Sequence, residues 1–513
     1  MAPRNVSPFT PHFNLVLEEI DSETAKMLTE AADLWAKNPD IQVAVAADQD
    51  AHGLDKKRER QALKAALADR GPKLTGLAND TSAQGVGAVF LSTGRPRLPA
   101  EVVFLFMVLR GRYNSLTDND AVDRFAESLS VLIYLENRGL SRPGRTTLLE
   151  NVNTLSSRTL EMILDAQALA IIGEGLDDGN EIMVDSTAVE SASAFPCDVR
   201  LMVDFSRRAH KTLCLLEKLG MPGFSSSLVE RWLKEAKSLH FQYNMSRTKA
   251  KKRKHYKRLS KCIHGMLLRL ADALRGMRVS WQAHSLPPRC HRLVRDRLDR
   301  TACDLIDAVH VLNQADLRVL EKTPTPTAEK VMSVCDADAY LIVKGDRVPK
   351  FGYKPGLSRG GNGFVYGLRL QSGNPADAPE LYPLIHQVIE RTGKIPTTVI
   401  ADDGYASKVG KAKVKACGVT NVVISGSKGK KMTPPDEWDA PEAQKHRNDR
   451  SAVESLMFTL KYVVGFGRMR RRGLEAVRSE MLEKIIAYNF RRIIQVREAK
   501  EREAEQQQRQ KAA

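Results

Sequence analysis

The order of strand-like and helix-like segments constrains the fold of this chain most. The period of the apolar residues changes at residue 181, where the β-branched run EIMVDSTAVES follows a helical region. A long helical segment fills residues 199–320, and later strand-like runs alternate with helices. These runs are AYLIV, FVYGLRL, TTVIADDG and VTNVVISG. The order predicts an α/β or α+β sheet with helices packed on it.

The region before the first strand reads as helical. It contains PAEVVFLFMVLRGRY, then TDNDAVDRFAESLSVLIYL with a Thr/Asp cap, then a helix opened by RPGRTT. Short helices joined by tight turns fit a helix-turn-helix-like DNA-binding module, and an ordinary helical bundle fits the same pattern. Both interpretations stay open at this point.

The charge of the chain indicates a polyanionic partner. Lys and Arg number 79 against 62 Asp and Glu, which gives a formal charge of +17 and a pI near 9.5. Seven of the ten residues in KAKKRKHYKR, residues 249–258, are basic. This run is either a solvated helix face or a face that follows phosphates. We take the following as candidate DNA contacts: Lys251, Lys252, Arg253 and Lys254.

Several classes of protein are excluded. No window approaches the roughly 18 to 20 consecutive apolar residues that a membrane span needs, so no membrane partner is expected. The N-terminal residues lack the pattern of a signal peptide, which predicts a cytoplasmic location. The seven cysteines form no C-x-x-C pair, which argues against a structural zinc module and a disulfide framework.

Three carboxylates stand out. Asp185 interrupts the first strand, Asp402 ends the run TTVIAD, and Glu454 lies on a helix between Arg450 and Lys461. Each has an ordinary alternative: Asp-Ser-Thr and Asp-Gly are common in turns and caps, and Glu454 could form an exposed ion pair with Arg450. Together they could hold two Mg²⁺ ions about 3.5 to 4 Å apart, the arrangement used for in-line phosphoryl chemistry.

The segment RSAVESLMFTLK adds a spacing to these residue types. Its apolar residues recur at offsets of three and four, which predicts a helix with one buried stripe. The stripe comprises Val453, Leu456, Met457, Leu460 and Val464. Arg450, Glu454 and Lys461 stack along a second face beside it.

At these residues the chain resembles a known family. VDSTAVES, IADDGYAS and RSAVESLMFTLK look like the three signatures of DDE transposases from bacterial insertion sequences, closest to the ISNCY-like branch. The resemblance covers about residues 85–495, and its last motif is Arg450, three residues, Glu454, six residues and Lys461. Arg447 stands where the family often has a Tyr, and Asp403 beside Asp402 is the alternative second ligand.

The resemblance implies an RNase H-like catalytic core with a mixed sheet flanked by helices. Asp185 would lie on the first strand, Asp402 just after the fourth, and Glu454 on a neighbouring helix. The gap between the two aspartates, 402 minus 185 or 217 positions, implies a helical insertion between the first and second strands. The predicted segments are an N-terminal helical segment at 1–80, a helix-turn-helix-like DNA-binding region at 81–177, the catalytic domain at 178–198 plus 328–495, the basic insertion at 199–327, and a frayed or disordered charged tail at 496–513.

The resemblance also implies an activity. The enzyme would use two Mg²⁺ ions, with Mn²⁺ able to substitute, to cut at terminal inverted repeats and join the end to target DNA. It would act as a homodimer on DNA, associated with the bacterial nucleoid. Arg450 and Lys461 would contact phosphate together with Arg470, Arg471 and Arg472. The alternatives are a nuclease of the same fold that does not join, and an inactive, transposase-derived DNA-binding protein.

Overall fold

The computed structural model describes residues 20–51, 98–113, 117–140, 143–193, 197–218, 226–280, 288–323, 332–333, 336–343 and 348–512. The chain divides into two compact units, each treated by itself. The first, here the core unit, comprises Met1–Ala51, Pro96–Ala192 and Asp338–Ala513. The second, here the insertion unit, comprises His52–Arg95 and Ser193–Ala337.

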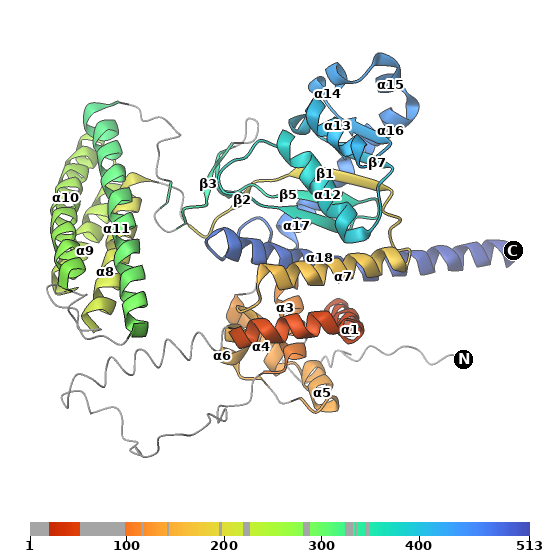
Figure 1. Ribbon diagram of the computed structural model, residues 1–513, viewed down its shortest axis with the longest axis horizontal. Coiled ribbons are helices and arrows are strands. Elements are labelled where there is room, and N and C mark those ends of the chain that lie inside the picture. The colour runs from red at the N-terminus through yellow and green to blue at the C-terminus, as the bar shows by residue number, and fades with distance from the viewer. Residues whose placement is uncertain are drawn as a thin grey trace. The chain divides into compact units, whose positions relative to one another are not determined.

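A five-stranded mixed sheet forms the centre of the core unit (Figure 1). Its strand order is β6-β5-β1-β7-β8. The strands are β1 (Glu181–Ser186), β5 (Gly356–Gly360), β6 (Val365–Arg369), β7 (Thr398–Ala401) and β8 (Asn421–Ile424). β1 pairs antiparallel with β5 and parallel with β7, and β8 extends the parallel part. The predicted α/β core with a mixed sheet is confirmed.

The first strand is central, and its composition explains why. β1 is nearly all apolar or small after Glu181, and Ile182, Met183 and Val184 are at most 2% exposed. A strand with neighbours on both sides and helices on its faces reads as a continuous apolar run. Asp185 is therefore a carboxylate in an otherwise apolar central strand, 9% exposed.

A small second sheet begins with the strand that follows β1 in the sequence. Its order is β2-β4-β3, with β2 (Val189–Glu190), β3 (Tyr340–Ile342) and β4 (Lys350–Tyr353). Gly352 is required in β4, because a Cβ there would lie 1.9 Å from the carbonyl oxygen of Val189. The run that forms β4 and β5, KFGYKPGLSRG, lacks the alternation of a strand, and the sequence does not predict it.

Helices surround the main sheet. α12 contacts β5, β6 and β1, while α18 runs beside α7 and contacts β6 (Figure 1). The helices near the sheet are α7 (Ser157–Gly173), α12 (Leu381–Thr392), α13 (Lys408–Ala416), α14 (Ser427–Met432), α15 (Pro435–Asp439), α16 (Pro441–Asp449), α17 (Ser451–Tyr462) and α18 (Leu474–Ala512).

The described helices of the predicted N-terminal regions belong to the core unit. Their helices are α1 (Ser22–Lys37), α3 (Ala100–Arg112), α4 (Asp118–Glu127), α5 (Leu129–Asn137) and α6 (Arg145–Val152), and residues 39–51 are also helical. α3 is almost completely buried and packs on α1, α4, α6 and α18. This packing is that of a helical bundle, and a DNA-binding role for residues 81–177 stays a prediction.

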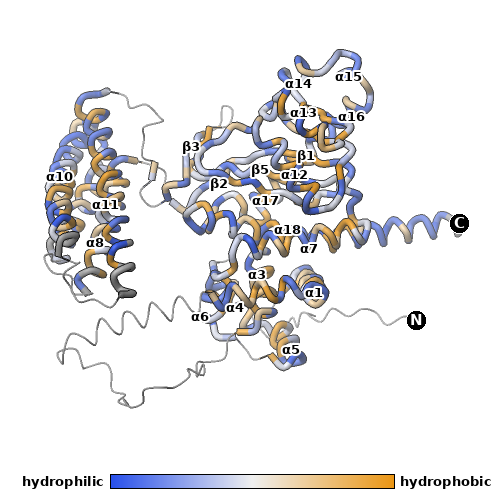
Figure 2. The backbone as a smooth tube through the Cα atoms, viewed as in Figure 1, coloured by the Kyte–Doolittle hydropathy of each residue, from blue (hydrophilic) through white to orange (hydrophobic). Residues whose placement is uncertain are grey.

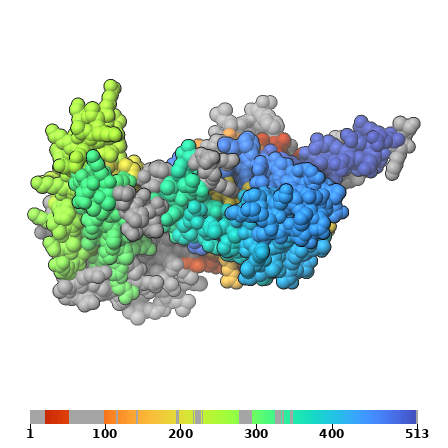
Figure 3. Space-filling view, turned by 90° about the horizontal axis from the view of Figure 1, so that it is seen from above, coloured from red at the N-terminus to blue at the C-terminus, as the bar shows by residue number. Residues whose placement is uncertain are grey.

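The C-terminal tail is helical instead of frayed or disordered. α18 continues without a break to Ala512, although residues 500–510 are exposed. Its dark blue end projects beyond the rest of the core unit (Figures 1 and 3). Arg497 pairs with Glu30 and with Glu174, which fixes α18 beyond residue 495. Helix-forming Glu, Gln, Lys, Arg and Ala residues then continue it.

The insertion unit consists of antiparallel helices with a core of their own. They are α8 (Asp198–Lys218), α9 (Ser226–Met245), α10 (Lys249–Ser280) and α11 (Pro288–Asp316), followed by a π-helical turn (Leu317–Glu321). Buried apolar residues from each helix meet in one cluster, which includes Phe205, Tyr256 and Met266, with Trp232 partly buried against it. Trp281 lies outside the described residues.

Candidate active site

Two of the predicted carboxylates lie at the same end of neighbouring strands. β1 and β7 run parallel, and Val184 is the register partner of Ala401. The next residues are Asp185 and Asp402, so the two carboxylates leave the sheet side by side at its carboxyl edge. In open α/β sheets this edge is where ligands bind.

The turn after β7 fixes Asp402. Its side chain accepts a hydrogen bond from the backbone N–H of Gly404 at 3.0 Å, which caps a short 3₁₀ helix, Asp403–Tyr405. A Cβ on Gly404 would lie 3.0 Å from an Asp402 oxygen and 3.1 Å from an Asp377 oxygen. Asp402 and Asp377 therefore converge on this glycine, where a side chain would be tightly packed against both carboxylates.

Asp403 has a different role from its neighbour. Its Oδ1 accepts hydrogen bonds from the backbone N–H groups of Lys428 and Gly429, at 2.7 and 3.0 Å. Its Oδ2 lies 3.3 Å from the Ser427 hydroxyl. The carboxylate thus caps the N-terminus of α14, where the helix dipole favours a negative charge.

Tyr405 is a buried residue close to the aspartates. The side chain is fully buried, and burial raises the pKa of its hydroxyl. Nearby Asp377, Asp185 and Asp402 raise that pKa further. Its hydroxyl therefore stays protonated and lies among three carboxylates.

The sequence did not single out Asp377 or its partner, Lys354. Lys354 Nζ lies 3.0 Å from Asp377, and both side chains are largely buried, at 11% and 17% exposed. Lys354 thereby balances one negative charge beside Asp402. Neither residue has a motif around it, and the two meet only because β4 and the segment before α12 are brought together by the fold.

Glu454 is held differently. It lies in the first turn of α17, a helix that contacts β1. The predicted stripe is confirmed, because Val453, Leu456, Met457, Leu460 and Val464 are all buried. The Glu454 side chain is 67% exposed, and its Oε1 lies 3.5 Å from Arg450. In the structure it thus forms the surface ion pair that was the ordinary alternative.

The three predicted acids do not form a closed ligand cluster. Within the described residues, the ligand atoms that come within 4.8 Å of one another in a group of three belong to Glu181, His446 and Asp449. Asp185 and Asp402 are brought to one edge of the sheet, while Glu454 is on the adjoining helix and paired with Arg450. A role for Glu454 beside the aspartates stays a prediction.

A comparison with known families decides the class of this domain. Residues 335–490 match the family model described as the transposase DDE domain. The chain carries a transposase DDE domain. No curated protein and no solved structure matches the sequence. The domain has a transposase-type function, and DNA is its partner. The ISNCY-like branch stays a prediction.

The matched range explains how the DDE domain is divided. It contains Asp402 and Glu454 but begins long after Asp185. β1 nevertheless pairs with β5 and β7, both within the match. The first strand of the domain is therefore separated in sequence from the others by the helices of the insertion unit. The match and the mixed sheet together confirm the predicted RNase H-like core.

Basic residues near the DDE motifs differ in their surroundings. Arg471 is committed to the interior, because it lies 2.7 Å from Glu483, which also pairs with buried Arg110. Arg470 approaches Asp118 at 3.4 Å, and Arg472 donates to the carbonyl of Ala192. We therefore do not propose Arg471 as a DNA contact.

Arg447, at the position where the family often has a Tyr, has a stacking role of its own. Its guanidinium lies 4.0 Å from the centroid of the Trp438 ring, and it donates to the Trp438 carbonyl at 2.7 Å. This cation–π contact fixes α15 against α16.

The basic run of the insertion unit lies on α10. Lys251, Arg253 and Lys254 are exposed and Lys252 is half-buried, with its Nζ 5.6 Å from the Tyr243 ring centroid. Figure 2 shows the hydrophilic colour along this helix. Arg253 also donates to the carbonyl of Leu320.

Among the described helices, none is long and apolar enough to cross a membrane.

Proposed function

We propose that this protein is a DNA transposase that cuts at the ends of its element and joins the released 3′ end to target DNA. The observation that carries the proposal is the in-register placement of Asp185 and Asp402 at one edge of the transposase DDE domain. A pair of carboxylates at this position suits phosphodiester chemistry better than it suits a structural role, because both acids lie in or directly after apolar strands.

The donor set fits hard divalent cations. Carboxylate oxygens are the ligands that Mg²⁺ and Mn²⁺ prefer, and Asp185 and Asp402 would hold such ions, with Glu454 as third ligand. When bound, two ions supply activation of the attacking oxygen and stabilisation of the leaving oxygen. Asp377 lies close enough to add negative charge, and Lys354 limits that charge.

The second ligand is assigned to Asp402 over Asp403. The Asp403 carboxylate is occupied by two backbone N–H groups and a hydroxyl at the N-terminus of α14. Withdrawing it to bind an ion would remove the cap of α14, and the loss of such a cap costs about 0.5 to 2 kcal/mol. Asp402 accepts a hydrogen bond from Gly404 within its own turn and lies near Asp377 and Tyr405.

Glu454 would join the aspartates when DNA binds. A phosphate near α17 would attract Arg450, whose contact with Glu454 is long at 3.5 Å and exposed. Such a surface pair contributes at most about 1 kcal/mol, so its exchange for a phosphate contact is inexpensive. Lys461, about two turns after Glu454 along α17, would contact the same DNA strand.

DNA would also follow the exposed basic face of α10. Lys251 and Lys254 project from one side of this helix with Lys257 and Arg258. Contacts of this kind hold the backbone without reading base sequence. Transposition pairs two ends, so we propose a homodimer assembled on DNA.

The test is a Mg²⁺-dependent assay on a labelled duplex that carries the element's own end, mixed with a plasmid target. Wild type is compared with Asp185→Asn, Asp402→Asn and Glu454→Gln. We expect cleavage and joined product from wild type alone. Cleavage without joined product would make the protein a nuclease, and end binding without cleavage by wild type would make it a DNA-binding relic.

A further inference from the structure

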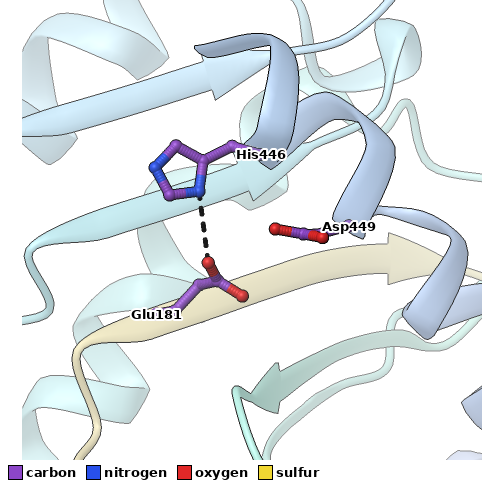
Figure 4. Close-up of side chains that lie close together, drawn as sticks. All are labelled: Glu181, His446 and Asp449. Atoms are coloured by element: carbon purple, nitrogen blue, oxygen red, sulfur yellow. Dashed lines mark hydrogen bonds and ion pairs between the residues drawn. The ribbon is translucent and has the colours of Figure 1, made fainter. Parts of the chain in front are cut away.

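At the start of β1, at the opposite end of the strand from Asp185, three potential metal ligands come together (Figure 4). Glu181 is the first residue of β1, and His446 and Asp449 lie on the last turn of α16. His446 Nδ1 lies 3.2 Å from Glu181 Oε2, with the side chains 19% and 26% exposed. One ligand atom from each residue falls within 4.8 Å of the other two.

The charges of this cluster are not balanced by the protein. Asp449 is half-buried and has no hydrogen bond or ion pair with any residue that the structure describes. Two carboxylates this close repel each other unless a cation or a proton lies between them. The Arg359 guanidinium interacts electrostatically with Glu181, and it donates to the sulfur of Met183.

The side chains also determine which cation would fit. One imidazole nitrogen and two carboxylate oxygens suit Zn²⁺ and similar transition-metal ions, whereas Mg²⁺ prefers oxygen ligands alone. A cavity of about 310 Å³ opens beside the cluster, and its lining includes His446, Arg447 and Glu442. Of the three proposed ligands, His446 lines this cavity, which makes that side of the cluster accessible to solvent.

We propose that Glu181, His446 and Asp449 form a binding site for a transition-metal dication, separate from the proposed catalytic ions. The ion would join the first residue of β1 to the end of α16. Asp449 precedes Glu454 by five positions, so the ion would also fix the start of α17. The site requires no DNA and does not rest on the proposed function, because it can be measured through binding and stability.

The experiment uses the full chain, stripped of metal, with Zn²⁺ as the probe. Zn²⁺ is expected to raise the midpoint of thermal unfolding of wild type by about 2 °C or more, and Mg²⁺ to leave it unchanged. His446→Gln and Asp449→Asn should each weaken Zn²⁺ binding in equilibrium dialysis at least about tenfold. Both residues are partly exposed, so neither variant should unfold the protein.

The matched control is His386→Gln. His386 Nδ1 also lies 3.2 Å from a glutamate oxygen, that of Glu390, but it has no third ligand. This variant should bind Zn²⁺ as wild type does. If Zn²⁺ does not stabilise wild type, the site is overturned and the residues form only a histidine–glutamate pair. If His446→Gln retains full Zn²⁺ affinity, the site is also overturned, and the bound Zn²⁺ is an adventitious ion only.

Discussion

Asp185 and Asp402 are one position beyond a pair of residues, Val184 and Ala401, that face each other across parallel strands. The carboxyl ends of neighbouring parallel strands lie together, so any acid in this register reaches the same edge of the sheet. Glu454 has no comparable constraint, because its helix is tied to β1 by apolar contacts and its carboxylate points to solvent. The three acids therefore differ in how firmly the fold places them.

The aspartates should be indispensable for cleavage. Asp185→Asn or Asp402→Asn removes a charged ligand while keeping the shape of the side chain, so we expect the rate of end cleavage to fall by at least about 10³-fold. The rate is measured with Mg²⁺ on a labelled end duplex, and end binding by gel shift should persist. Cleavage at more than a tenth of the wild-type rate would exclude that aspartate from the site.

Asp403 should behave in the opposite way. Asp403→Ala removes the cap of α14, and we expect a loss of about 1 to 2 kcal/mol in the free energy of unfolding. At a temperature where the variant is folded, cleavage should stay within a few-fold of wild type. Urea titration and the end-cleavage assay together check this. A variant that is stable but unable to cut would reverse the assignment of Asp402 and Asp403.

Glu454 should be needed for cleavage and should contribute little to the stability of the fold. Its side chain is 67% exposed and paired with Arg450 at 3.5 Å, so Glu454→Gln should change the free energy of unfolding by less than about 0.5 kcal/mol. Cleavage should nevertheless be lost, because the third ligand is missing. Glu230→Gln, which removes a similar exposed pair with Lys234, is the control and should affect neither property. Equal cleavage by both variants would return Glu454 to an ordinary surface charge.

Local patterns predicted part of this site well. The buried stripe of α17 follows from spacing alone, and Asp185 and Asp402 were found because each breaks or ends an apolar strand. Lys354 and Asp377 were not found, since they come from segments without a periodic pattern and meet only in the folded chain.

Local patterns carry no information where a distant partner decides the surroundings of a residue. Arg471 belongs to a run of three arginines that reads as a solvent-exposed, phosphate-binding surface. In the fold its partner is Glu483, twelve positions later on α18, which draws the guanidinium into the interior. Glu181 and His446 gave no signal either, because 265 positions separate them. No local pattern contains this information.

The basic face of α10 predicts a salt dependence. Lys251→Gln combined with Lys254→Gln should reduce the slope of log affinity against log salt by about 2, since each lost phosphate contact contributes about 0.9. Affinity for unrelated duplexes should fall equally, because these contacts read no bases. Fluorescence anisotropy at several salt concentrations measures both. Lys234→Gln, on neighbouring α9 and paired with Glu230, is the control. An unchanged slope in the double variant would place DNA elsewhere.

The buried network of Arg110, Glu483 and Arg471 should govern acid stability. Burial raises the pKa of Glu483, but attraction to Arg110 and Arg471 prevails and holds it below the ordinary value of 4.5. A carboxyl whose folded pKa is depressed stabilises the protein above pH 4.5, and this contribution is lost as the pH falls through the folded value. Glu483→Gln leaves two guanidinium groups without their partner, so at pH 7 we expect a loss of about 3 kcal/mol in the free energy of unfolding.

The same variant tests the pH dependence of this network. The difference in unfolding free energy between wild type and Glu483→Gln, measured by urea titration, should be constant above pH 4.5 and narrow below it, because wild type loses the charge that the variant already lacks. Glu498→Gln, which removes an exposed pair with Lys26, should cost less than about 0.5 kcal/mol at either pH. A difference that stays constant down to pH 3 would mean that Glu483 acts through its shape and hydrogen bonds, with no contribution from its charge.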